Sequence, residues 1–313
     1  MDLRSLGKSG LSTPRLVLGG NVFGFTVSGD EAFALLDRFV AAGGTMIDTA
    51  DVYSAWVPGH VGGESETLLG QWLRRRGRRD DVLIATKVGY EEGLAASTIT
   101  RGIEGSLRRL QTDYVDLYYS HKDDGETPFE ETLGAFDGLV RAGKVRSIGA
   151  SQVSAERLDA AMQVSATNGL VAYSVLQTWY NLLERPKFEG ALAETAQAHG
   201  LGVLAFYGLA NGFLTGKYRS EKDLGKSVRG DQVAQYLQGK GPRVLAALDQ
   251  VAAESGATPA QIALAWISAK PGVTAPIASA TSVIQLEELL GAMQLELTGE
   301  QMERLDVASS DGG

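Results

Sequence analysis

The chain has 313 residues, of which 44% are hydrophobic and 21% charged, a composition that allows a globular protein with a sizeable core. Its formal net charge of −9 argues against non-specific binding to nucleic acid or to an anionic membrane surface. Because the chain has no cysteine, disulfides, thiolate nucleophiles, Cys-ligated zinc and iron–sulfur clusters are excluded.

Metal and membrane sites also lack the expected residue patterns. The three histidines, His60, His121 and His199, are widely separated and form no HExxH-type pair, so we expect no histidine metal site. Residues 1–5 lack the apolar run of a signal peptide, and no stretch of about 18 apolar residues suggests a membrane span. We therefore expect a cytoplasmic protein that binds neither nucleic acid nor membrane, while self-association stays open.

Short apolar segments alternate with amphipathic helical segments along the chain. Eight of the apolar segments are typical of strands: Leu16–Leu18, Thr45–Ala50, Val82–Val88, Tyr114–Ser120, Val145–Ala150, Tyr173–Gln177, Gly202–Tyr207 and Val273–Ala278. Regular alternation predicts parallel strands covered by helices. Eight such units favour closure into an α/β fold of the (β/α)8 TIM barrel type, with one domain over residues 1–313.

Sequence signals for helix starts support this division. Five segments match the S/T-x-x-E/Q capping box: Ser28–Glu31, Thr127–Glu130, Thr258–Gln261, Ser282–Gln285 and Thr298–Gln301. In two of them, Pro128 and Pro259 stand at the first helical position, where a missing N–H costs nothing.

Three segments depart from the plain repeat. Residues 3–12, around Gly7 and Gly10, predict a small N-terminal β-hairpin before the first strand. Residues 208–241 form a long Gly-rich and charged excursion after the seventh strand, and loops of this length in compact domains are usually functional. Gly299–Val307 predicts one extra C-terminal helix beyond the barrel.

Polar residues gather where successive predicted strands end. The second strand ends in Asp48, with Tyr53 just beyond it, the third ends in Lys87, and the fourth ends at His121. Neighbouring strands lie about 4.8 Å apart, so these residues should share a patch roughly 10 Å across. Each alone has an ordinary structural role, but four of them at three adjacent strand ends indicate catalysis, which barrels place at this face.

These residue types suit the reduction of a carbonyl group. Hydride addition leaves an alkoxide that needs a proton, and a phenol with a pKa of about 10 is a poor acid at neutral pH. We expect the buried ammonium of Lys87 to lower the pKa of Tyr53, and Asp48 to keep that lysine charged and oriented. His121 can donate to the developing oxyanion or share its proton relay.

The common phosphate-binding fingerprints are incomplete. Gly7-Lys8-Ser9 and Gly225-Lys226-Ser227 lack the glycine that a P-loop needs five residues earlier, because Asp2 and Ser220 stand there. Residues 19–24 follow a strand but do not form GxGxxG. A nicotinamide cofactor would therefore need an architecture other than the Rossmann fold.

With these motifs together, the sequence resembles the aldo-keto reductase superfamily, bacterial type, over nearly its whole length. Four segments stand in the family's order: Asp48-Thr49-Ala50-x-x-Tyr53, Gly63-Glu64-Ser65-Glu66, Ala85-Thr86-Lys87 and Tyr119-Ser120-His121. The resemblance implies a catalytic tetrad of Asp48, Tyr53, Lys87 and His121, with Tyr53 as general acid. It also implies a nicotinamide cofactor bound by the barrel.

The resemblance extends to residues that would hold this cofactor. Ser151 and Gln152 fall where the family presents Ser-Asn to the carboxamide, and Tyr207 matches the ring that stacks on the nicotinamide. The implied cofactor-binding set is Gly20, Asn21, Asp48, Ser151, Gln152, Gln177, Tyr207, Gly208, Leu209, Gly212, Leu214, Thr215, Gly216, Lys217, Ala278, Ser279, Thr281, Gln285 and Glu288.

One departure from the family pattern concerns the choice of cofactor. Thr281 stands where the related G-A-R pattern has its arginine, and Leu289 stands where an adenine-contacting Asn is common. An Arg fork to a phosphate is a strong recognition contact, so its absence weakens a strict preference for the 2′-phosphate. The resemblance favours NADP(H), and NAD(H) or dual use stays open.

The loops after strands one, two and six supply candidate walls of a substrate pocket. Phe23, Trp56 and Trp179 are aromatic and have few charges around them, which fits a neutral carbonyl compound or a sugar. Each tryptophan could equally be ordinary packing.

Other functions remain in view. One is a redox-sensing, cofactor-binding regulatory subunit, like the potassium-channel β-subunits that share the fold, and another is a sugar-directed ketoreductase. A glycosidase would need paired carboxylates at strand ends. Asp48 and Asp51 are the close pair, but Asp48 already has Lys87 as its partner.

Overall fold

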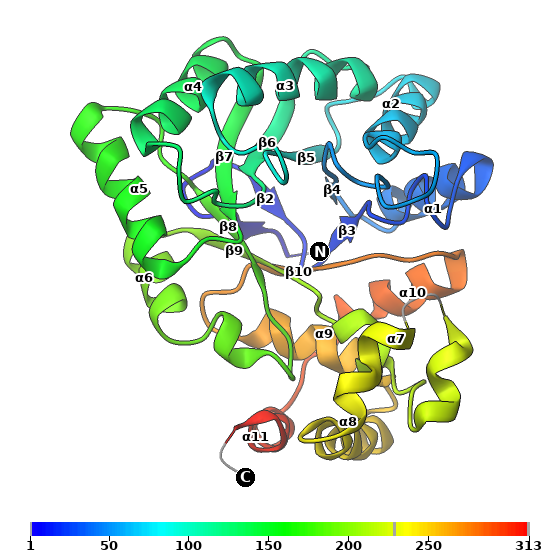
Figure 1. Ribbon diagram of the computed structural model, residues 1–313. Coiled ribbons are helices and arrows are strands. Elements are labelled where there is room, and N and C mark those ends of the chain that lie inside the picture. The colour runs from blue at the N-terminus through cyan, green and yellow to red at the C-terminus, as the bar shows by residue number, and fades with distance from the viewer. Residues whose placement is uncertain (1, 228–229, 312–313) are drawn as a thin grey trace.

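Eight parallel strands form a closed ring in the computed structural model, which describes residues 2–227 and 230–311 (Figure 1). Around the ring the order is β10-β3-β4-β5-β6-β7-β8-β9. The strands are β3 (Val17–Gly19), β4 (Met46–Asp48), β5 (Leu83–Val88), β6 (Val115–Ser120), β7 (Val145–Ser151), β8 (Val175–Trp179), β9 (Gly202–Phe206) and β10 (Ala275–Ala278). Each overlaps one predicted apolar segment, so the predicted (β/α)8 barrel is confirmed.

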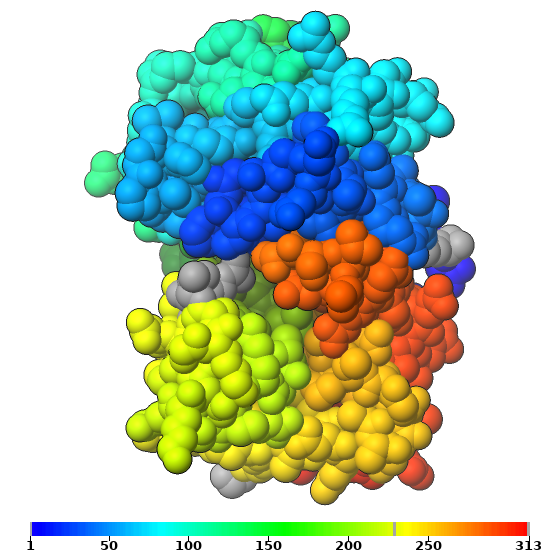
Figure 2. Space-filling model, turned by 90° about the vertical axis from the view of Figure 1, so that its right-hand side faces the viewer, coloured from blue at the N-terminus to red at the C-terminus, as the bar shows by residue number. Residues whose placement is uncertain are grey.

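Helices surround this ring and cover the outer faces of the strands (Figure 1). They are α1 (Gly29–Ala41), α2 (Glu64–Arg76), α3 (Ala96–Leu110), α4 (Phe129–Arg141), α5 (Ala155–Asn168), α6 (Ala191–His199), α9 (Pro259–Ala269) and α10 (Val283–Ala292). Helix α10 contacts α1, and Figure 2 shows the orange segment of α10 against the blue N-terminal part of the chain. The first and last units of the barrel therefore meet, which closes the ring of helices.

The predicted helix caps are correct in part. Thr258 and Thr298 form complete capping boxes with Gln261 and Gln301. Ser282 caps α10, but the side chain of its partner Gln285 accepts from Thr281 instead.

Two of the predicted caps are wrong. Ser28 precedes α1 without a side-chain cap hydrogen bond. Pro128 is itself the N-cap of α4, because its extended ψ of 138° places it before the first helical turn.

A predicted hairpin closes the N-terminal end of the barrel. Strands β1 (Arg4–Ser5) and β2 (Ser12–Thr13) pair antiparallel in a separate small sheet. Leu6 and Leu11 from their connection are buried together with Met46, Leu117 and Val175, which point into the barrel. The barrel interior is thus a packed core, and an active site is expected at the opposite end of the barrel.

The excursion after β9 contains several short helices rather than a single loop. The described parts are the 3-10 helices η2 (Ala210–Thr215), η3 (Glu221–Lys226) and η4 (Ala234–Leu237), with α7 (Gly230–Val233) between the last two. Residues 228 and 229 of the predicted excursion lie outside the described residues. Another 3-10 helix, η1 (Arg185–Lys187), precedes α6.

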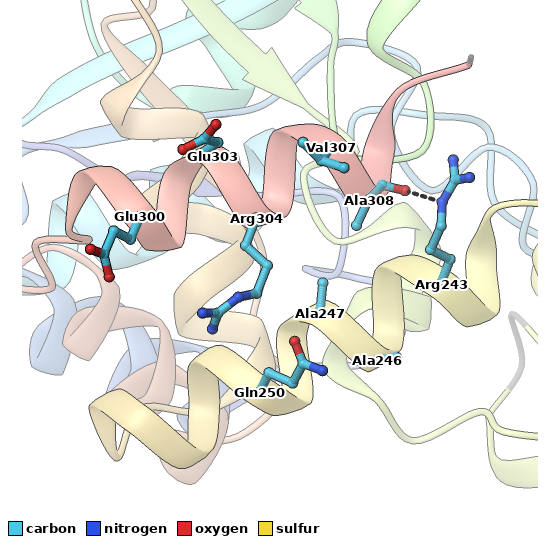
Figure 3. A pocket seen from close by; sticks show the side chains of 9 residues that line it. All are labelled: Arg243, Ala246, Ala247, Gln250, Glu300, Glu303, Arg304, Val307 and Ala308. Carbon is cyan, nitrogen blue, oxygen red and sulfur yellow. Dashed lines mark hydrogen bonds between the residues drawn. The ribbon is translucent and has the colours of Figure 1, made fainter. Parts of the chain in front are cut away.

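Two helices pack outside the barrel. The predicted extra helix is confirmed as α11 (Gly299–Ser309), and it packs against α8 (Gly241–Ser255), which the sequence analysis does not identify as an additional helix. A groove between them is lined by Arg243, Gln250, Arg304 and Val307, among others, and Arg243 donates to the carbonyl of Ala308 (Figure 3). None of the predicted site residues lines this groove.

Among the described residues, no helix is long and apolar enough to cross a membrane. Nor does that part of the chain hold a group of three or more His, Cys, Asp or Glu side chains suited to a metal ion.

Candidate active site

The strand pleat gathers the predicted residues at one rim of the barrel. Successive side chains of a strand point to opposite faces. Met46 and Ala85 point into the barrel core, so Asp48 and Lys87, two residues later in each strand, point inward at the next layer. Gln177 follows Val175 in the same way on β8. These polar side chains therefore form a layer above an apolar core.

Lys87 is the centre of this layer. Its side chain is fully buried, and its Nζ donates to Asp48 Oδ2 at 2.6 Å, to the carbonyl of Thr49 at 2.7 Å and to Tyr53 Oη at 2.8 Å. Gln177 Nε2 donates to the other oxygen of Asp48 at 2.7 Å. All three ammonium protons and both carboxylate oxygens are thereby engaged, which fixes the positions of both charges.

The first turn of α2 braces the ends of β3 and β4. Ser65 Oγ donates to the carbonyl of Gly20 at 2.8 Å, and Thr49 Oγ1 donates to Ser65 Oγ at 2.8 Å. Gly20 N–H in turn donates to the carbonyl of Asp48 at 2.7 Å. This explains why the Gly63–Glu66 segment belongs with the tetrad, since it holds the strand ends that carry Asp48.

Burial shifts the pKa of Tyr53 in the direction opposite to the prediction. The pKa of Tyr53 lies well above its ordinary value, first because burial disfavours the phenolate and then because the Asp48 carboxylate is near. The pKa of Lys87 is lowered by burial, against the opposing influence of Asp48. Tyr53 therefore holds its proton at neutral pH, and Lys87 acts on the phenolate only as negative charge develops.

His121 lies beside Tyr53, as predicted from the strand ends. Its ring centroid is 6.1 Å from that of Tyr53 in an edge-to-face arrangement, and its backbone N–H donates to the carbonyl of Val88. Burial, followed by the charge of Lys87, holds the pKa of His121 well below its ordinary value. Its buried Nδ1 has no hydrogen-bond partner among the described residues. A neutral imidazole with one N–H is the form that this environment favours.

The structure adds two aromatic residues that the sequence analysis missed. Tyr90 is 45% exposed and lies 4.8 Å from His121 between ring centroids. Phe25 packs edge-on against Trp56, which is 51% exposed and lies 6.1 Å from Tyr53. The available signal for Tyr90 is its place three residues after Lys87, in the loop at the same barrel face.

Of the predicted pocket walls, Phe23 is wrong. Its side chain is fully buried in the core between strands and helices, so it offers no surface to a substrate. Trp56 is exposed beside Tyr53, and Trp179 packs against Tyr207. In the loop after β3, Phe25 rather than Phe23 therefore lies next to Trp56.

One end of the predicted cofactor set surrounds Tyr207. Tyr207 is 41% exposed, and its ring is tilted by 31° to that of Trp179, with the centroids 4.2 Å apart. Tyr207 has a left-handed φ of 57°, held by Asn181 Nδ2, which donates to its carbonyl at 2.9 Å. Gln152 has a φ of 47°, and its Nε2 donates to the carbonyl of His121 at 3.1 Å.

The segment after Tyr207 has an unusual backbone. Ala210, Asn211 and Gly212 have consecutive positive φ values of 46°, 56° and 92°. The N–H groups of Ala210 and Gly212 donate to the carbonyls of Tyr207 and Leu209 at 2.8 and 2.9 Å, so backbone hydrogen bonds hold this turn. The Lys217 ammonium lies beside Gly212 and 5.0 Å from the ring centroid of Tyr218. Leu214 is fully buried, so only its backbone can face a ligand.

The other end of the predicted set lies where β10 meets β3. Ser279 Oγ donates to Asn21 Oδ1 at 2.6 Å, and a side chain at Gly19 would collide with Ser279 Oγ. The exposed Thr281 donates both its N–H and its Oγ1–H to Gln285 Oε1.

The remaining predicted residues lie in or next to these three groups. Ser151 is buried and pairs with Gln177 in the register of β7 and β8, and the carbonyl of Glu288 accepts from Gln261. The others are Gly20, Gly208, Leu209, Thr215, Gly216 and Ala278.

Comparison with known proteins matches residues 15–310 to the Aldo/keto reductase family. The chain belongs to this family. A relative from Bacillus subtilis (strain 168), the uncharacterized oxidoreductase YrpG, is 35% identical, with 100% of this chain and 98% of the relative covered.

Two further relatives show how varied the named members are. A probable voltage-gated potassium channel subunit beta from Oryza sativa subsp. japonica is 33% identical over 98% of this chain and 96% of the relative. An L-glyceraldehyde 3-phosphate reductase from Escherichia coli O157:H7 is 31% identical over 100% of this chain and 93% of the relative. Membership in the aldo/keto reductase family identifies this protein as an oxidoreductase but leaves its substrate open.

Proposed function

We propose that this aldo/keto reductase reduces a neutral aldehyde, ketone or sugar to the alcohol, with NADPH as the hydride donor and NADH as the alternative. The observation that carries the proposal is the position of Lys87 Nζ, which lies 2.8 Å from Tyr53 Oη and 2.6 Å from Asp48 Oδ2. A phenol held against a buried ammonium is suited to giving its proton to a developing alkoxide.

Each member of the tetrad has a separate role in this proposal. Tyr53 donates its Oη proton to the alkoxide oxygen, and Lys87 stabilises the phenolate that remains. Asp48, held by Gln177, keeps Lys87 charged in a buried site. His121, as a neutral imidazole, donates an N–H to the carbonyl oxygen.

The residues present fit a dinucleotide cofactor, which supplies the hydride when bound. The exposed ring of Tyr207 beside the tetrad suits a flat nicotinamide ring. The ammonium of Lys217, beside the left-handed turn at 210–212, suits a pyrophosphate. Thr281 and Gln285 offer neutral hydrogen-bonding groups rather than a cation, which is why NADH stays an alternative.

The first test is a fluorescence titration with NADPH and NADH. Trp179 packs against Tyr207, so a nicotinamide that binds at Tyr207 should quench the fluorescence of Trp179. Trp179→Phe should therefore remove most of the quenching. Tyr53→Phe should bind the cofactor nearly as well as the parent protein, yet lose about 100-fold or more in the reduction of a neutral aromatic aldehyde. Binding of neither cofactor, or full turnover by Tyr53→Phe, would contradict the proposal.

A second candidate function is that of a cofactor-binding regulatory subunit. The relative from Oryza sativa named as a potassium channel subunit favours it. The same titration separates the two functions. Tight cofactor binding without turnover of aldehydes, ketones or sugars would support the regulatory role.

A further inference from the structure

A buried polar cluster lies on the outer side of the strands that carry the tetrad. Thr86 and Tyr118, paired in the register of β5 and β6, point away from the barrel interior toward the helices, while Lys87 and Tyr119 point inward. Glu66 of α2 accepts hydrogen bonds there from Thr86 and from Arg109 of α3. With Asp51 and Tyr118, these residues form what we call the Asp51 cluster: Asp51, Glu66, Thr86, Arg109 and Tyr118.

Asp51 is the acidic residue of this cluster that lacks a full set of partners. Glu66 is fully buried, and its two oxygens accept from Thr86 Oγ1 at 2.6 Å and from Arg109 Nε at 2.7 Å. Asp51 Oδ1 is also buried, but it has no hydrogen-bond partner in the described part of the chain. Because Arg109 already neutralises Glu66, a charge on Asp51 would stand without a hydrogen-bonded counterion.

Asp51 is tied directly to the strand that carries Lys87. Its backbone N–H donates to the carbonyl of Lys87 at 3.3 Å, and it follows Asp48 by three residues at the end of β4. The charges of Asp51 and Glu66 both act to raise the pKa of Lys87. The charge of Asp51 therefore influences the Lys87 ammonium, which faces Tyr53.

The surroundings place the ionisation of Asp51 close to neutral pH. Burial, followed by the charge of Glu66, raises the pKa of Asp51 to about 7, against the opposing charge of Arg109, a backbone hydrogen bond from Val52 and the charge of Lys87. The remaining titratable group of the cluster, Tyr118, has a pKa well above its ordinary value because of burial, so it stays neutral in this range.

We propose that Asp51 is a positioning residue that acts through Lys87, and that carbonyl reduction by this protein slows when Asp51 ionises. A negative charge behind Lys87 weakens the positive potential that stabilises the developing Tyr53 phenolate. When Asp51 is protonated, that potential is restored. The inference rests on the proposed function, because it concerns the rate of that reaction.

The test compares kcat/KM for reduction of a neutral aldehyde at pH 6 and pH 8, with the cofactor saturating. In the parent protein the value should fall by about threefold or more across this range. The pKa of Tyr53 lies well above this range and that of His121 well below its ordinary value, so neither accounts for the step. Asp51→Asn should keep at pH 8 the rate that it has at pH 6.

Two variants control this experiment. Asp51→Glu restores a titrating carboxyl and should recover a step. Tyr118→Phe removes the other unpartnered polar atom of the cluster without removing a titrating group in this range, so it should keep the step. An identical step in Asp51→Asn and the parent protein, or no step in the parent protein, would overturn the inference.

Melting temperatures give a second readout that needs no turnover. The pKa of Asp51 is about 7 in the folded protein and about 4 in the unfolded chain. Between these two pH values the folded protein keeps a proton that the unfolded chain has lost, so the free energy of unfolding falls as the pH rises. The parent protein should therefore lose stability relative to Asp51→Asn as the pH rises from 5 to 8. A difference that stays constant with pH would overturn the inference. Absence of reductase activity in the parent protein would instead overturn the proposed function, and the catalytic role of Asp51 with it.

Discussion

At the scale of single residues, the pKa values of the site depend on burial, because burial disfavours the charged form of each group. The sequence analysis expects Lys87 to lower the pKa of Tyr53, but the buried phenol beside Asp48 has a raised pKa. The three hydrogen bonds of Lys87 Nζ fix the position of the ammonium. They do not bring the pKa of Tyr53 below its ordinary value. Replacement of Lys87 should therefore affect both catalysis and folding.

Lys87→Met should lose about 100-fold or more of the reduction rate and about 3–5 kcal/mol of unfolding free energy. The loss of stability arises because Asp48, 1% exposed, would keep a buried charge without its ammonium partner, held by the amide of Gln177 and by the more distant Tyr53 hydroxyl at 3.4 Å. Urea unfolding and steady-state kinetics measure the two effects.

The control is the double variant Asp48→Asn, Lys87→Met, which removes both charges. It should recover part of the lost stability without recovering activity. Equal stability of Lys87→Met and the parent protein would show that the ion pair is not buried as described.

At the scale of elements, the capping-box pattern predicts a helix N-cap correctly where the side chain reaches the first turn of the helix. Thr258 and Thr298 form complete capping boxes, whereas Ser28 makes no cap hydrogen bond. The sequence pattern S/T-x-x-E/Q is the same in all three. The side-chain orientation at the first turn, which the pattern does not record, makes the difference.

Thr258→Ala should lower the unfolding free energy by about 1 kcal/mol, because the N–H of Gln261 loses its acceptor. Ser28→Ala is the matched control and should cost much less, since Ser28 makes no cap hydrogen bond. Chemical denaturation of both variants measures the difference, and equal losses would contradict this account of the two caps.

At the scale of the whole molecule, the fold separates a packed end of the barrel from a reactive one. The hairpin buries Leu6 and Leu11 against the inward layer that contains Met46 and Val175. The polar layer of Asp48, Lys87 and Gln177 lies at the other end of the same strands. The hairpin therefore supports the site from below without touching it.

Leu6→Ala should destabilise the protein by about 2–5 kcal/mol, because Leu6 is fully buried and its removal leaves a cavity inside the barrel. Leu3→Ala, in the same hairpin but 61% exposed, should change the unfolding free energy little. Thermal or urea unfolding of the two variants provides the comparison. A small loss in Leu6→Ala would show that the hairpin does not seal the barrel.

The sequence by itself determined the barrel and the meeting of Asp48, Tyr53 and Lys87. Strand periodicity and eight-fold alternation are local properties, and the ends of adjacent parallel strands must lie together. The family resemblance predicted which residues would bind the cofactor.

Only the tertiary structure decided properties that depend on neighbours distant in sequence. Burial of Phe23, exposure of Tyr90 and the contact of Phe25 with Trp56 follow from how loops of different units pack. The raised pKa of Tyr53 and the unpartnered oxygen of Asp51 follow from desolvation by surrounding elements. Desolvation and pairing are sums over the whole surroundings of a group, so spacing along the chain does not specify them.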